Sequence, residues 1–111
     1  MYKIYGIPNC DTVKKALTHL NNSKLKYEFI NFKKQAPTKE ELNTWKDAFG
    51  DWPVNKRGPT YRKIKEEFEA ATSPQKYKIL IETTSAIKRP ILVENDKVVC
   101  FGYDEDSYKK L

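Results

Sequence analysis

The stretch MYKIYGIPNCDTVKKALTHLNNSKLKYEFINF, residues 1–32, decides the fold. Residues 1–6 alternate and are rich in tyrosine and isoleucine, which predicts a strand that Gly6 ends. Apolar side chains then recur at helical spacing from Asp11 onward, and Asn21-Asn22-Ser23 ends that helix. Residues 24–32 alternate again and predict a second strand. A strand, a helix and a strand within about 30 residues indicate a βαβ unit with parallel strands.

The middle of the chain reads as helical. Thr38, followed three residues later by Glu41, predicts a capping box at the start of a helix that Gly50 ends. A loop over residues 51–59 leads to a helix over about 60–71. A further helix begins at Ser73-Pro74, which we expect to cap it.

The end of the chain carries a hairpin signal. The apolar runs 91–94 and 97–103 are joined by Asn95-Asp96, a pair typical of a two-residue turn. We expect Asp104 to cap a short last helix ending at Leu111. The order predicts an α/β fold: a thioredoxin-like mixed four-stranded sheet in one domain, residues 1–111. A helical insertion, about 37–84, separates the βαβ half from the hairpin.

Composition narrows the function classes. The 111 residues are 39% hydrophobic and 32% charged, with a net charge of +6. No apolar run approaches the roughly 20 residues that cross a bilayer, and the first ten residues do not form a secretory signal. We therefore expect a cytoplasmic protein that does not bind membranes. The basic residues are spread along the chain and interrupted by acidic ones, so we do not expect it to bind nucleic acid.

Two cysteines, at positions 10 and 100, do not make a disulfide framework, and their separation matches no metal-ligand spacing. With His19 as the single histidine, we expect no metal site. In a reducing cytosol a functional cysteine is more often catalytic than structural. His19 lies off the apolar stripe of its helix, and we expect it to be exposed and without a role.

Cys10 follows a predicted strand and directly precedes a helix, where free amides and the helix dipole favour a thiolate. Lys14, one turn further along the helix, adds positive charge that favours the thiolate, whereas the Asp11 carboxylate weakly opposes ionisation of the thiol. The alternative is an inert residue that fits a turn. We favour the reactive thiol because such a loop is where ligands bind in βα units.

Three further segments give the cysteine a context. YGIPNCDTVKKA (5–16), NKRGPTYRK (55–63) and AIKRPILV (86–93), followed by VVCFGY (98–103), resemble the ArsC-type arsenate reductase family in order and spacing. The nearest branch is similar to YffB-type proteins, and Spx-type regulators are neighbours.

The resemblance implies that Cys10, Arg57 and Arg89 bind and activate an oxyanion, since guanidinium groups suit anions and stabilise thiolates. The Arg89-Pro90 bond falls where this fold carries a cis-proline, and both isomers stay open. We expect contacts to substrate from the neighbours of these residues, namely Asn9, Asp11, Thr12, Lys14 and Pro90.

Three positions depart from relatives. Arsenate reductases carry arginine where this chain has Lys14 and commonly histidine where it has Gly6, and Spx-type proteins carry a second cysteine where it has Val13. Without a local resolving cysteine, the thiol needs an external one, and glutathione is the obvious co-substrate. Cys100 reads as a small buried hydrophobe; as a resolving cysteine it would need to lie within disulfide reach of Cys10.

We therefore predict a monomeric glutathione-dependent thiol or oxyanion reductase with no bound cofactor. Two alternatives stay open. One is a non-enzymatic regulator that binds RNA polymerase, as the Spx-type resemblance implies. The weaker one is a nucleic-acid-binding domain that rests on the net charge alone.

Overall fold

The computed structural model describes residues 1–111, which form two compact units. The sheet unit comprises Met1–Gln35 and Arg89–Leu111, and the helical unit comprises Ala36–Lys88. The helical unit contains the insertion predicted at about 37–84. No helix has the length and apolar composition needed to cross a membrane.

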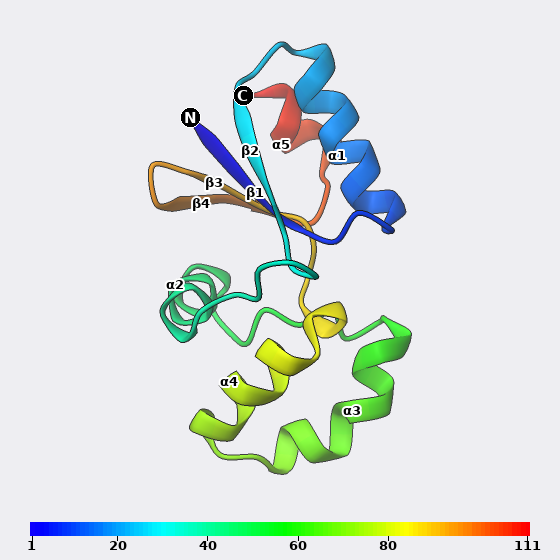
Figure 1. Cartoon of the computed structure of the whole chain (residues 1–111), viewed down its shortest axis with the longest axis vertical. Helices are drawn as coiled ribbons and strands as arrows, with labels where there is room; N and C mark the ends of the chain where they lie inside the picture. The colour runs from blue at the N-terminus through cyan, green and yellow to red at the C-terminus, as the bar shows by residue number, and fades with distance from the viewer. The chain divides into compact units, whose positions relative to one another are not determined.

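Four strands form the sheet of the first unit (Figure 1). They are β1 (Tyr2–Gly6), β2 (Tyr27–Asn31), β3 (Ile91–Glu94) and β4 (Lys97–Phe101). Their order is β2-β1-β3-β4; β1 and β2 are parallel, and the other two pairs are antiparallel. The predicted mixed four-stranded sheet and its parallel βαβ unit are therefore confirmed.

Two helices, α1 (Asp11–Asn22) and α5 (Glu105–Lys109), lie on the same side of this sheet (Figure 1). The apolar stripe of α1 supplies two members of a buried cluster, and the strands and α5 supply the others. The cluster consists of Ile4, Ala16, Leu20, Leu92 and Tyr108. Each member is at most 1% exposed, so this cluster holds α1, and with it the residue before α1, against the sheet.

The turn between β3 and β4 is the predicted one. Asn95 and Asp96 have φ values of 50° and 65°, the left-handed pair that a two-residue hairpin needs. Asp104 occupies the position before α5, as predicted, but its side chain makes no capping hydrogen bond to the helix backbone; its carboxylate accepts a hydrogen bond from the Ser107 hydroxyl at 2.6 Å. The helix ends at Lys109 rather than Leu111.

The second strand is shorter than predicted. It begins at Tyr27 rather than residue 24, because Lys24 takes a left-handed φ of 57° and so turns the chain instead of extending it. Leu25, which we counted in the strand, packs against the buried cluster from this turn.

The helical unit contains α2 (Lys39–Phe49), α3 (Pro59–Ala70), α4 (Ser73–Glu82) and a 3₁₀ turn (Thr84–Ala86). The predicted capping box of α2 is confirmed, since Thr38 and Glu41 exchange hydrogen bonds of 3.0 and 3.1 Å. The predicted cap of α4 is wrong, because Thr72 occupies that position and exchanges hydrogen bonds with Gln75. A cap at Ser73 would face Lys76 three residues on, and a lysine ammonium cannot accept an amide hydrogen bond.

Candidate active site

Cys10 is the residue immediately before α1, at the carboxyl end of β1. Its extended backbone (φ −133°, ψ 123°) lets its carbonyl accept the first helical bond, from the Lys14 amide at 2.9 Å. The side chain is half-buried. The Cys10 sulfur thus lies at a helix start, where the amides of the first turn have no partner within the helix and stabilise an anion.

Several groups act on the Cys10 thiol in opposite directions. Burial alone would raise its pKa. Hydrogen bonds from the Val13 amide and the Arg89 guanidinium, the Arg89 charge and the Thr12 amide together outweigh burial. The pKa of Cys10 is therefore lowered from its ordinary value. A lowered pKa gives more of the reactive thiolate near neutral pH.

Arg89 comes to Cys10 from the other end of the sequence. It directly precedes β3, the strand that pairs with β1, and its bond to Pro90 is cis. The pairing of Tyr5 with Ile91 brings the residues before β3 to the end of β1 where Cys10 follows. Pro90 is fully buried and Arg89 half-buried. The structure therefore brings together Cys10, Arg89 and Pro90 of the predicted site.

The remaining neighbours of Cys10 lie in its loop and in the first turn of α1. Asn9, Asp11 and Lys14 are exposed, and Thr12 is half-buried. Of these four residues, Thr12 contributes to the lowered pKa of the Cys10 thiol, through its amide. Contacts from all four to a substrate stay a prediction.

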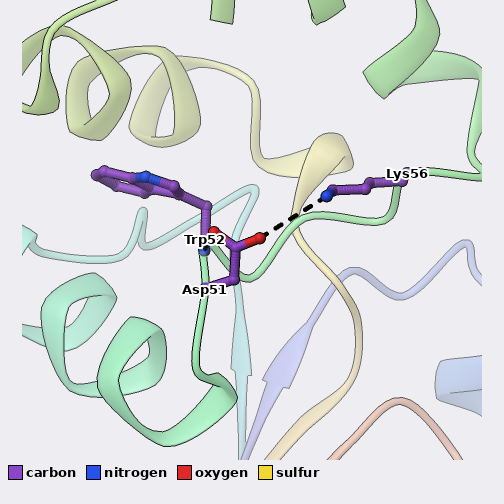
Figure 2. A network of polar contacts seen from close by, with 3 residues as sticks. All are labelled: Asp51, Trp52 and Lys56. Atoms are coloured by element: carbon purple, nitrogen blue, oxygen red, sulfur yellow. Dashed lines mark hydrogen bonds and ion pairs between the residues drawn. The ribbon is translucent and has the colours of Figure 1, made fainter. Parts of the chain in front are cut away.

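Arg57 belongs to the helical unit, where it is exposed in the loop before α3. Figure 2 shows how that loop begins: the Asp51 carboxylate accepts the Trp52 amide at 2.8 Å and pairs with the Lys56 ammonium at 3.7 Å. The indole of Trp52 points away from Lys56. The ion pair ties Lys56, the residue before Arg57, to the loop's start. The pairing of Arg57 with Cys10 stays a prediction.

Trp52 carries an arrangement that the sequence did not predict. The ammonium groups of Lys46 and Lys76 lie 4.9 and 5.7 Å from its ring centroid, at cation–π distance. Phe68 and Tyr77 meet the same ring edge-on. These residues come from three different helices, so no spacing along the chain could have indicated them.

Cys100 lies on β4 and is half-buried, with its sulfur 3.4 Å from the Gly102 carbonyl oxygen. It packs against the buried cluster of the sheet unit, which agrees with the predicted apolar role. No disulfide joins Cys100 to Cys10. No group of three or more potential metal ligands exists in the structure.

The prediction for His19 is wrong. Its ring is half-buried, Nε2 donates to the Tyr108 carbonyl oxygen at 3.1 Å, and the two rings meet edge-on at 5.5 Å. A position off the apolar stripe of α1 predicted exposure, but α5 covers that position. This partner is 89 residues away in sequence, so helical spacing could not reveal it.

The chain is similar to a protein family and to individual proteins over nearly its whole length. The ArsC family model matches residues 5–111. An uncharacterized protein of Haemophilus influenzae is 32% identical, with 98% of this chain and 96% of that protein aligned. The regulatory protein MgsR of Bacillus subtilis is 27% identical, over 96% of this chain and 86% of MgsR.

Solved structures agree with these matches. A protein described as YFFB superposes with a TM-score of 0.87 at 34% identity, covering 99% of this chain and 97% of its own. A possible arsenate reductase from Streptococcus mutans gives a TM-score of 0.76 at 28% identity, with 93% and 91% covered. The likeness that the sequence motifs predicted therefore extends over nearly the whole chain.

Proposed function

This chain belongs to the ArsC family, and on that premise we propose that it is a glutathione-dependent thiol or oxyanion reductase whose nucleophile is Cys10. The observation that carries the proposal is the environment of the thiol. Amides of the first turn of α1 and the Arg89 guanidinium lower its pKa against the effect of burial. A half-exposed thiolate of this kind is a nucleophile rather than a packing residue.

The proposed cycle has two displacements on sulfur. The Cys10 thiolate attacks the glutathione sulfur of a mixed disulfide, forms Cys10–S–S–glutathione and releases the substrate thiolate. A second glutathione thiolate attacks the glutathione sulfur of that adduct, forms oxidised glutathione and restores the Cys10 thiolate. The two electrons come from the two glutathione molecules.

With an oxyanion such as arsenate, the Cys10 thiolate attacks arsenic(V), and one arsenate oxygen leaves as water after protonation. A glutathione thiolate then attacks the Cys10 sulfur of this adduct, which releases arsenic as arsenite (arsenic(III)) and forms Cys10–S–S–glutathione. A second glutathione restores the Cys10 thiolate as before.

The surrounding residues divide the remaining work. Arg89 stabilises the thiolate and the leaving thiolate, because its planar donors suit an anion better than an ammonium group does. Arg57 and Lys14 hold negative charge on the substrate. Contacts from Asn9, Asp11, Thr12 and Pro90 orient the substrate. Glutathione supplies the second thiol because no cysteine stands at position 13.

The first test is adduct formation. The folded protein is incubated with oxidised glutathione, and intact mass with peptide mapping locates the adduct. We expect one glutathione on Cys10, the same in Cys100→Ser and none in Cys10→Ser. No adduct, or equal labelling of both cysteines only after unfolding, would contradict the proposal.

The second test identifies the substrate class. Consumption of NADPH by glutathione reductase reports oxidised glutathione, first with a glutathionylated peptide and then with arsenate as the substrate. Turnover that is lost in Cys10→Ser identifies the substrate that the site uses. Turnover with neither substrate, from a protein that does form the adduct, would contradict a reductase of either kind.

The likeness to MgsR, a regulatory protein, favours one second candidate. In it the chain acts without catalysis by binding RNA polymerase, as the Spx-type resemblance implies. A pull-down of polymerase subunits separates the two functions. Equal recovery by wild type and Cys10→Ala would favour the regulator, and no recovery by either protein would exclude it.

A further inference from the structure

Gly6, the last residue of β1, is buried and directly faces Val13 of α1. A Cβ placed on Gly6 would lie 2.9 Å from Val13 Cγ2 and 3.6 Å from Val13 Cγ1. Carbon atoms prefer separations of about 3.5–4.0 Å. Val13 therefore fills the space between β1 and α1 next to position 6, and only a residue without a side chain fits at that position.

The strand side of this contact cannot readily give way. Gly6 pairs with Asn31 in the parallel ladder, and its carbonyl accepts the Phe32 amide at 2.8 Å. On the other side, the Cα atom of Pro90 would stand 3.9 Å from the added Cβ. The end of β1 is thus held by hydrogen bonds and flanked by a buried residue.

The side chain of Val13 cannot readily give way either. It is completely buried, and a β-branched residue within a helix has one strongly preferred rotamer. Relief of a new contact therefore falls on the backbone of the first turn of α1. That backbone includes the Val13 amide, one of the amides of the first turn of α1 that favour the thiolate of Cys10, the residue before the helix.

We infer that Gly6 is a positioning residue for Cys10: its missing side chain lets Val13 seat against β1, which sets the distance between the Val13 amide and the sulfur. Gly6 touches neither the sulfur nor a substrate. It acts through Val13, and a larger residue moves the first turn of α1 away from the thiolate. The inference rests on the proposed function in taking the Cys10 thiolate as the nucleophile, but its test needs no glutathione.

The experiment compares Gly6→Ala, Val13→Ala and the double variant Gly6→Ala/Val13→Ala. The rate of alkylation of Cys10 by iodoacetamide is followed against pH in a Cys100→Ser background. In Gly6→Ala we expect the midpoint to move to higher pH and the rate at pH 7 to fall about two- to tenfold, the effect of weakening one amide hydrogen bond. In the double variant, which keeps the added methyl and removes its obstacle, we expect the profile to return to that of Val13→Ala.

Gly50→Ala in the helical unit is the matched control. It adds the same methyl group at a left-handed position with no atom within 4 Å, so it destabilises without touching Val13. We expect its profile to match wild type. A Gly6→Ala profile identical to wild type would overturn the inference, and so would a double variant displaced from Val13→Ala to higher pH. The second comparison holds even if Gly6→Ala alone does not fold.

This outcome is separable from that of the proposed function. Loss of the adduct with oxidised glutathione in wild type, with alkylation shifted as expected in Gly6→Ala, would contradict the reductase and leave the positioning role standing. An adduct in wild type together with an unchanged Gly6→Ala profile would contradict the positioning role of Gly6 and leave the proposed reductase standing.

Discussion

Tyr108 offers a prediction in which removing a polar group stabilises the protein. Its ring is 1% exposed in the buried cluster of the sheet unit, and its hydroxyl has no hydrogen-bond partner in the protein. A buried hydroxyl without a partner costs free energy, because it loses its hydrogen bonds to water and gains none in the protein. We expect Tyr108→Phe to be more stable than wild type.

The substitution leaves the other contacts of Tyr108 in place. Its ring still meets those of Tyr103 and His19, at centroid distances of 4.9 and 5.5 Å, and its backbone carbonyl still accepts from His19. The change is therefore the relief of desolvation alone, about 1 kcal/mol at the lower end of the usual range. An unfolding entropy of about 2.1 cal/mol/K per residue makes this a rise in Tm of roughly 4 °C for a chain of 111 residues.

The gain grows in alkaline solution. Burial, with smaller effects of Cys100 and Tyr103, raises the pKa of Tyr108 far above its ordinary value. The protonated ring is thus favoured in the folded state, and its contribution to stability is complete below about pH 10 and lost as pH rises further, when the unfolded chain ionises. The difference between Tyr108→Phe and wild type should widen by up to about 1.4 kcal/mol per pH unit above pH 10.

Urea unfolding followed by near-ultraviolet circular dichroism at pH 7 and pH 10.5 measures both effects. Tyr27→Phe is the matched control, because the same atom there donates a hydrogen bond to Asn21 at 2.9 Å. We expect that variant to be slightly less stable than wild type. A Tyr108→Phe protein less stable than wild type at pH 7, or a difference that does not grow with pH, would refute the reasoning.

Two further predictions concern the thiol and a helix end. Arg89→Ala removes a donor and a positive charge from the Cys10 thiolate, so the pKa of Cys10 rises. The rate of alkylation at pH 7 falls about tenfold, while the rate at pH 10 is unchanged. A variant that reacts at the wild-type rate at both pH values would show that Arg89 does not act on the thiol. Gly50→Ala places a side chain at φ 84° after α2, where no atom lies within 4 Å, so it costs about 1–2 kcal/mol of backbone strain alone. A free energy of unfolding in urea within about 0.3 kcal/mol of the wild-type value would contradict a left-handed end to this helix.

Much of the fold could be predicted because its signals are local. The period of apolar residues in α1, the Thr38 capping box and the Asn95-Asp96 turn each depend on a few neighbouring residues. One of the errors has a local cause too. The cap of α4 depends on which of two adjacent hydroxyl residues has a glutamine three positions on, and that residue is Thr72.

The site was predicted in unequal parts. A cysteine before a helix is visible in the residues themselves, so Cys10 could be identified as a thiol in an amide-rich place. Arg89 could be named only through the resemblance to a family, because nothing near it in the chain points to residue 10. The sequence drew attention to position 13 only because Spx-type proteins carry a cysteine where this chain has Val13. The role of the Val13 amide was missed, since every residue but proline carries a backbone amide and the residue type gives no signal.

The sequence by itself determined which residues form strands and helices, and that a thiol stands at a helix entrance, since these depend on neighbours within one or two turns. Only the tertiary structure decided what surrounds that thiol. The pairing of β1 with β3 brings Arg89 to Cys10, and the packing of α1 on β1 closes the space above Gly6 with Val13. Arg89 and Cys10 are far apart along the chain, and Gly6 and Val13 are close in sequence but belong to different elements. The geometry of both contacts is set by the sheet register and by close packing rather than by any local pattern.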